Sequence, residues 1–323
     1  LFRSIFRYLH NKKSEKRGKQ QQIAKALEGT MKKASTSFGW TIVFLLGVLF
    51  GFPKCTRALQ MQSSSAPKKI LVLGGTGFVG GNVIRYALAE GYEVTSLSRR
   101  GAPSSARATL KVDWKQGDAT DPDVVAELVQ EGKFDGIVHA IGMLFEGEAN
   151  KFASGSGSIP DPDATYDKIT RKTAFCAMAA LAEAKKNKLG ELETPPPFVF
   201  VSAAEAKWGF DKVFEGTPAE FLRRYLIAKR AVEDKLLKEY GSGPNPSLRP
   251  VIFRPSLVWT RERPQALPPV LAFTVANAIG IPQVDRPVTV ETLAKAIVAS
   301  LKDKRVQGIK DFREMDKLAG RIR

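Results

Sequence analysis

A glycine-rich stretch that follows a short apolar run constrains this chain more than any other feature. The apolar residues Ile70–Leu73 are followed by Gly74, Gly77 and Gly80, spaced G-x-x-G-x-x-G, and then by a helical pattern over Asn82–Glu90. Glycines permit positive φ, close approach of a ligand to the backbone and close packing of a helix on a strand. Unpaired N–H groups at the helix start bind a diphosphate. The pattern predicts a strand, a phosphate-binding turn and a helix, with a dinucleotide held by Gly74, Thr76, Gly77, Phe78, Val79 and Gly80.

Length and composition limit the classes of protein to consider. A chain of 323 residues, 43% of them hydrophobic, can bury the core of one large domain with additions. Two cysteines and two histidines exclude a disulfide framework and an ordinary zinc cluster, so we expect no metal site. The net charge of +17 permits nucleic-acid binding, but no stripe of basic and aromatic residues favours it.

The first 66 residues have the composition of an addressing segment. Residues 1–35 hold ten Lys or Arg against two Glu, and Leu1–His10 alternates apolar and basic residues as a mitochondrial presequence does. A second interpretation starts at Met31: Lys32 and Lys33, the apolar run Phe38–Phe52 and a small-residue end form the order of a signal peptide. That run has about 15 residues, which is short for a membrane span. Both addresses stay open: the mitochondrial inner membrane, on its matrix side, or a plastid reached through a signal peptide.

Strand and helix patterns alternate along the rest of the chain. The expected strands after the first are Gly91–Ser98, Leu110–Ala119, Phe134–Gly142, Phe198–Ala204 and Val251–Trp259. Six such units predict an α/β fold, a Rossmann doubly wound parallel sheet. We expect this domain to cover residues 67–260, and residues 261–323 to form a small C-terminal lobe that closes over the cofactor.

The strand ends predict how the dinucleotide is held. An NAD-binding site has an acidic residue about 20 positions after the glycines, whereas this chain has Ser98, Arg99 and Arg100 there. Guanidinium groups suit a 2′-phosphate, so NADP(H) is favoured. Alternatively, both arginines are simply solvated, and NAD(H) is possible. We expect the adenine at Asp118 and Ala119, and the ribose beside Ala140, Ile141 and Gly142.

Three residues form the candidate catalytic set. Ser202 ends the fifth strand, and Tyr225 and Lys229 share one face of the next helix because they lie four positions apart. The tyrosine would donate a proton to a carbonyl oxygen, with its pKa lowered by the lysine, and the serine would bind the same oxygen. The spacing alone is weak evidence, since it also occurs at Tyr8 and Lys12. Lys229 in a non-catalytic site would only hold the nicotinamide ribose.

Three other features have simpler interpretations. His139 lies inside an apolar strand and Cys176 inside an Ala-rich helix, Tyr166–Asn187, so both are expected in or near the core. The irregular segment Glu146–Pro162, with its Gly-Ser run, is a substrate lid, a partner-binding loop or a disordered loop.

These motifs together resemble a known family. Gly-Gly-Thr-Gly-Phe-Val-Gly, Ser-Leu-Ser-Arg-Arg-Gly, Ser202, the Tyr225 to Glu233 pattern and Arg254-Pro255-Ser256 resemble the atypical short-chain dehydrogenases. The resemblance covers about residues 68–305 and is closest to the accessory proteins of coenzyme Q biosynthesis, with the Rossmann accessory subunit of mitochondrial complex I as a cousin. It implies a bound nicotinamide dinucleotide, cofactor contacts at Pro255 and Ser256, and association with a membrane protein complex.

Three hypotheses of function follow. The first is an NADP(H)-dependent oxidoreductase for a quinone-like or other apolar carbonyl compound. The second is a cofactor-holding assembly subunit without turnover, and the third is a plastid dehydrogenase-like protein that binds RNA. The fold by itself cannot choose among them.

Overall fold

The computed structural model describes residues 67–104, 110–146, 150, 159–186, 194–262 and 267–322. The expected addressing segments within residues 1–66 and the Gly-Ser run at 155–158 lie outside these residues. Within the described ranges, no helix has both the length and the apolar character needed to span a bilayer.

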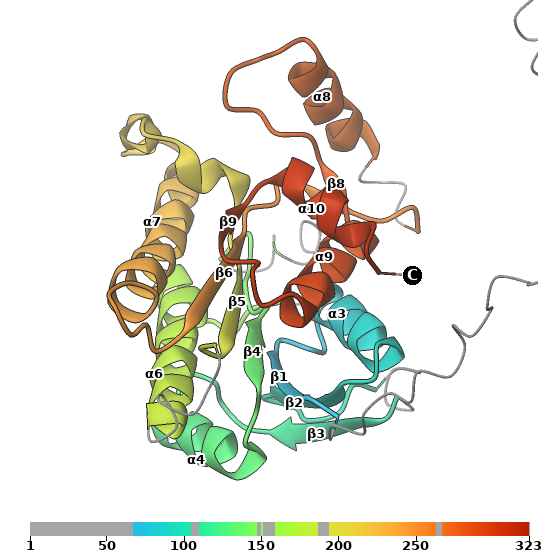
Figure 1. Cartoon of the computed structure of the whole chain (residues 1–323). Coiled ribbons are helices and arrows are strands. Elements are labelled where there is room, and N and C mark those ends of the chain that lie inside the picture. Colours follow the sequence, from blue (N-terminus) through green and yellow to red (C-terminus); the bar gives the residue numbers. More distant parts are fainter. Residues whose placement is uncertain are drawn as a thin grey trace, which may run out of the picture. The chain divides into compact units, whose positions relative to one another are not determined.

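Seven parallel strands form the central sheet (Figure 1). In spatial order they are β3 (Val112–Gln116), β2 (Glu93–Ser98), β1 (Lys69–Leu73), β4 (Gly136–His139), β5 (Pro197–Val201), β6 (Arg249–Phe253) and β9 (Gly308–Lys310). The order of the strands reverses between β1 and β4, as in a doubly wound Rossmann sheet. The predicted fold class is therefore confirmed.

The sequences of the strands explain their places in the sheet. The central strands β4 and β6 are buried at every residue, because helices cover both faces of a parallel sheet. The strand β3 lies at one edge, and three of its five residues are exposed.

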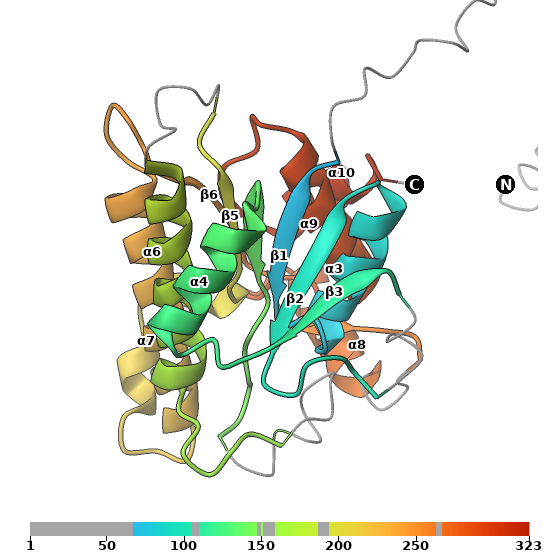
Figure 2. The same ribbon diagram turned by 90° about the horizontal axis from the view of Figure 1, so that it is seen from below.

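Two layers of helices enclose the sheet, as Figure 2 shows. On one face lie α3 (Phe78–Ala89), α9 (Val290–Lys302) and α10 (Phe312–Ala319), which share a core with one set of strand side chains. On the other face lie α4 (Pro122–Gly132), α6 (Thr173–Lys185) and α7 (Glu220–Lys235).

Local signals in the sequence set several helix ends. Asp121 caps α4 by accepting hydrogen bonds from the N–H groups of Asp123 and Val124. Asp311 and Glu314 form a capping box at the start of α10. The expected long helix after Tyr166 begins as the π-helix η2 (Asp167–Lys172) and continues as α6.

The C-terminal region differs from the expected small lobe. The strand β9 pairs with β6 as the seventh strand of the main sheet, and α9 and α10 belong to one of its helix layers. Apolar residues such as Leu293, Ile297 and Met315 complete the core over β1 and α3, which is why this segment packs within the main domain. The main sheet thus continues past the boundary expected at residue 260.

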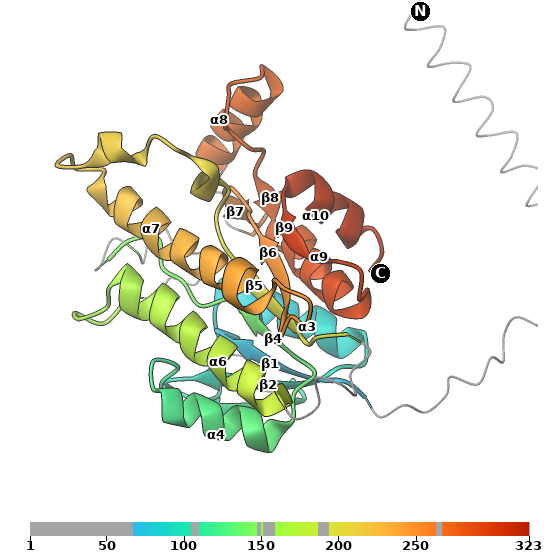
Figure 3. The same ribbon diagram turned by 60° about the vertical axis from the view of Figure 1, so that its left-hand side comes forward.

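The part of this region that lies outside the main layers is α8 (Leu267–Ala278), with the short paired strands β7 (Val258–Trp259) and β8 (Val288–Thr289) (Figure 3). Three further short helices, η4 (Ala204–Lys207), η5 (Asp211–Phe214) and η6 (Leu236–Tyr240), flank α7 in the chain. The side chains of Leu271 and Ile279, on and directly after α8, are 65% and 70% exposed.

Candidate functional site

The three glycines of the turn after β1 differ in what surrounds them. Gly74 has a φ of +87°, and a Cβ there would lie 2.9 Å from the carbonyl oxygen of Ala140. A Cβ on Gly80 would lie 2.2 Å from the carbonyl oxygen of Gly74. At Gly77, the N-cap of α3, the nearest atom to an added Cβ is that same oxygen, at 3.1 Å. Gly74 and Gly80 are therefore required for the turn to form, whereas a Cβ at Gly77 would make a tight contact that a shift of a few tenths of an ångström relieves.

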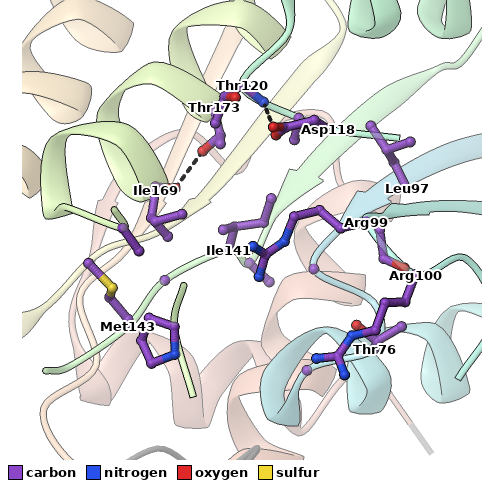
Figure 4. A pocket seen from close by; sticks show the side chains of 18 of the residues that line it. Thr76, Leu97, Arg99, Arg100, Asp118, Thr120, Ile141, Met143, Ile169 and Thr173 are labelled. Carbon is purple, nitrogen blue, oxygen red and sulfur yellow. Dashed lines mark hydrogen bonds between the residues drawn. The ribbon is translucent and has the colours of Figure 1, made fainter. Parts of the chain in front are cut away.

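A cavity of about 860 Å³ lies at the carboxyl ends of β1, β2 and β4, where the strand order reverses. Figure 4 shows part of its lining, including Thr76, Asp118 and Ile141. The predicted cofactor residues that line it are Gly74, Thr76, Gly77, Ser98, Arg99, Arg100, Asp118, Ala119, Ala140, Ile141 and Gly142.

The other predicted site residues lie outside this lining. Phe78, Val79 and Gly80 form the first turn of α3. The candidate catalytic residues, Pro255 and Ser256 are likewise not part of the lining. The link between the two groups is Lys229, whose Nζ would lie 3.6 Å from a Cβ placed on Gly142. Lys229 therefore lies at the edge of the cavity, next to Gly142.

Arg99 and Arg100 both line the cavity at the end of β2 (Figure 4). The guanidinium of Arg99 forms an ion pair with the carboxylate of Asp161. Arg100 has no ion-pair partner among the residues that the structure describes. Sequence reasoning missed Asp161, because it is 62 positions away from Arg99 and no local pattern marks it.

The expected adenine end of the cavity lies at Asp118, just after β3. The backbone N–H of Thr120 donates to Oδ1 of Asp118 at 2.9 Å, which fixes that carboxylate after β3. Thr120, Met143 and Thr173 also line the cavity, and the sequence analysis did not single them out. A hydroxyl next to a predicted Gly-Asp strand end is the signal that could have identified Thr120.

Lys229 connects the candidate catalytic residues. It is 3% exposed, and its Nζ donates to the carbonyl oxygen of Val201 at 2.7 Å. The same Nζ lies 5.5 Å from the ring centroid of Tyr225 and 4.9 Å from that of Phe200. Burial lowers the pKa of Lys229 to about 8, although Glu233 opposes this shift.

The pKa of Tyr225 shifts in the direction opposite to our expectation. Burial raises it above the ordinary value for a phenol, and the nearby Glu205 carboxyl raises it further. Lys229 does not offset these effects, because its ammonium lies over the ring and its hydrogen bond goes to Val201. In this state of the protein, Tyr225 is a neutral phenol with its proton in place.

Ser202 follows β5 directly, and its backbone N–H donates to the carbonyl oxygen of Phe253 at 2.8 Å. It is 4% exposed, and its Oγ has no hydrogen-bond partner among the described residues. A buried hydroxyl without a partner is costly, so this atom is suited to bind an incoming polar group.

Glu205 is a second residue that the sequence analysis missed. It accepts a hydrogen bond from Oγ of Ser256 at 3.2 Å, and burial raises its pKa. Its position three residues after a strand-ending serine is the signal that could have found it. Pro255 lies on the same side, and its carbonyl oxygen accepts from the N–H of Ala204 at 2.8 Å.

His139 is a core residue, as predicted. It is fully buried, its Nε2 lies 2.8 Å from Oγ1 of Thr173, and burial lowers its pKa to about 3. The neutral ring packs against Phe198 and Phe200 of the neighbouring strand. Cys176 is partly buried near the same core, and burial raises its thiol pKa.

Comparisons with known proteins agree with this geometry. The model of the NAD dependent epimerase/dehydratase family matches residues 70–280. MIOREX complex component 2 of Saccharomyces cerevisiae is 28% identical over 223 residues, which are 60% of this chain and 74% of that protein. An uncharacterized chloroplastic protein of Arabidopsis thaliana is 23% identical over 84% of this chain and 88% of its own length.

Among solved structures, one similar protein is an oxidoreductase of the short-chain dehydrogenase/reductase family from Burkholderia thailandensis. Its TM-score is 0.52 and its sequence identity 18%, and the match covers 76% of this chain and 90% of that one. A variant of ElxO with NADPH bound is similar with a TM-score of 0.54 and 16% identity, over 76% of this chain and 97% of that one. At these identities the structures support the fold alone. The resemblance to the short-chain dehydrogenases is confirmed by the family match and this shared fold.

Proposed function

We propose that this chain, which belongs to the NAD dependent epimerase/dehydratase family, is an oxidoreductase that uses a nicotinamide dinucleotide to reduce an apolar, quinone-like carbonyl compound. The observation that carries the proposal is the position of Lys229, between the cavity edge at Gly142 and the side chains of Tyr225 and Phe200. Family membership supports the dinucleotide itself.

The residues present fit such a cofactor. Gly77 is the N-cap of α3 and carries no side chain there, and the helix dipole at this end suits a diphosphate. The buried Oγ of Ser202 lacks a protein partner and is available to a substrate oxygen. When bound, the nicotinamide would supply hydride.

Each candidate catalytic residue then has a separate role. Ser202 would donate a hydrogen bond to the carbonyl oxygen of the substrate. Tyr225 is a neutral phenol, and it would donate its proton to the oxygen that becomes an alkoxide in the reduction. Lys229 would hold the ribose beside Gly142.

For the cofactor we propose NADP(H), because Arg99 and Arg100 are the side chains at the end of β2 and no carboxylate of β2 itself lies there. For the location we propose an organelle, with the mitochondrial inner membrane, on its matrix side, favoured by the basic leader and by the resemblance to coenzyme Q accessory proteins. The chloroplastic relative favours a plastid instead.

The experiment measures NADPH consumption by the purified protein with short-chain benzoquinones and aromatic ketones, next to nucleotide titrations. Tyr225→Phe should leave the Kd for NADPH nearly unchanged and lower turnover about 100-fold. Tyr166→Phe is the matched control, because Tyr166 is a buried neighbour whose hydroxyl donates to the carbonyl of Leu144. Equal turnover in Tyr225→Phe and the unmutated protein would refute the catalytic assignment.

A second candidate function is a cofactor-holding subunit of a protein complex without turnover. Two observations favour it: the exposed apolar side chains of α8, with Leu271 at 65% exposure, and a relative that is named as a complex component. Under this alternative, Tyr225→Phe is silent, whereas substitutions in the turn at Gly77 abolish function because they prevent cofactor binding.

A further inference from the structure

The ion pair between Arg99 and Asp161 joins two segments across the adenosine end of the cavity. Arg99 follows β2, whereas Asp161 lies in the segment between β4 and η2, where Ile159 and Pro160 line the same cavity. The two side chains are 48% and 54% exposed. A carboxylate therefore lies where the end of β2 supplies none.

The local backbone holds this carboxylate in place. Asp161 lies between Pro160 and Pro162, whose rings fix their own φ angles. The carbonyl oxygen of Asp161 accepts from the N–H of Ala164 at 2.9 Å, which closes a turn. A stiff turn loses little conformational entropy when its carboxylate meets a ligand.

A carboxylate at this position has two effects on a dinucleotide. It neutralises Arg99 and repels a phosphate dianion. Of the two arginines, only Arg100 then has a guanidinium without an acidic partner among the described residues. It can also accept a hydrogen bond from a ribose hydroxyl, which is the role of the acidic residue in NAD-binding sites.

We propose that Asp161 determines the cofactor preference of this site, by opposing the 2′-phosphate of NADP(H) and by accepting a hydrogen bond from the adenosine ribose of NAD(H). The inference rests on the proposed function, in that it requires the cavity to bind a nicotinamide dinucleotide. The two arginines favour NADP(H), and Asp161, from another part of the chain, reduces that preference.

The test is a titration of the full chain and of Asp161→Asn with NADPH and with NADH. Asparagine keeps the size of the side chain and removes its charge. The variant should bind NADPH more tightly and NADH more weakly, so that the ratio of the two Kd values shifts by about tenfold towards NADPH. The shift should decrease at high salt, because exposed charges are screened.

Asp163→Asn is the matched control. It removes the same charge two positions away, where the carboxylate forms its ion pair with Lys168 and interacts with Arg99 only more weakly, and it should change the ratio much less. In an Arg99→Gln background, Asp161→Asn should lose much of its gain for NADPH, because the two residues act as a pair. Asp161→Ala gives a second variant, and it should shift the ratio in the same direction.

The possible outcomes separate this inference from the proposed function. Unmutated protein that binds neither nucleotide would overturn both. Normal binding with an unchanged ratio in Asp161→Asn and Asp161→Ala, or an equal shift in Asp163→Asn, would overturn the role of Asp161 alone.

Discussion

Replacing Gly77 and Gly80 by alanine, one at a time, should separate ligand binding from folding within a single turn. Both glycines belong to the same motif, and a sequence pattern assigns them the same importance. The structure does not, because an added Cβ meets different surroundings at the two positions. We expect Gly77→Ala to fold and to lose nucleotide affinity, and Gly80→Ala to lose stability.

The contact distances give the magnitudes. At Gly77 the φ of −79° is open to alanine, and a Cβ would be 3.1 Å from the Gly74 oxygen, so the cost is a small shift of that oxygen and a poorer N-cap, about 1 kcal/mol. At Gly80, helix propensity alone would favour alanine by about 1 kcal/mol. A Cβ there would instead lie 2.2 Å from the backbone oxygen of Gly74, which cannot move without opening the turn. We expect a net loss of about 3 kcal/mol.

The assay combines urea unfolding with NADPH titration. Gly77→Ala should weaken NADPH binding at least about tenfold, because its methyl group would push the diphosphate away from the backbone N–H groups and weaken a hydrogen bond to a charged group. Gly209→Ala is the control, because a Cβ there meets no described atom within 4 Å and its φ is not positive. Unchanged NADPH affinity in Gly77→Ala, or full stability of Gly80→Ala, would refute this account of the turn.

Two further predictions concern buried charges. The pKa of Lys229 is about 8 in the folded protein and 10.5 ordinarily, so between these values the unfolded chain binds more protons and stability should rise with pH. In urea unfolding, the free energy of unfolding of the unmutated protein relative to Lys229→Met should therefore rise by up to about 3 kcal/mol between about pH 7 and about pH 10. A difference between the two proteins that stays constant with pH would contradict the pKa shift. Glu233 binds the Arg254 guanidinium, with 4% and 19% of the side chains exposed. Glu233→Ala should cost about 3 kcal/mol in the same assay, because it leaves the arginine charge buried and unpaired, and a loss below about 1 kcal/mol would contradict this.

The turn after β1 shows why part of the site could be predicted from the sequence. The apolar run, the glycine spacing and the helical pattern are all local, and a parallel sheet brings the ends of its strands to one edge. These two facts were enough to predict that Gly74, Arg100, Asp118 and Gly142 line one cavity. The position of Lys229 beside Gly142 was also expected, because its helix follows the fifth strand.

The seventh strand shows where local patterns do not suffice. β9 has three residues, which is too short for a period of two to be recognised, and it is a strand only because Ile252 and Phe253 of β6 pair with it. The packing of α9 and α10 against α3 places it there. A pairing between distant segments is decided by the completed core, and no short window of sequence contains it.

The chemistry of the site divides in the same way. The sequence by itself determined the fold class, the glycine turn after β1 and the residues at the ends of β1, β2 and β4, because each depends on neighbours within a few positions. Only the tertiary structure decided that Asp161 pairs with Arg99, that Glu205 lies near Tyr225 and that the pKa of Tyr225 is raised. Burial and long-range electrostatics depend on which segments meet in space, and packing of the whole domain determines that.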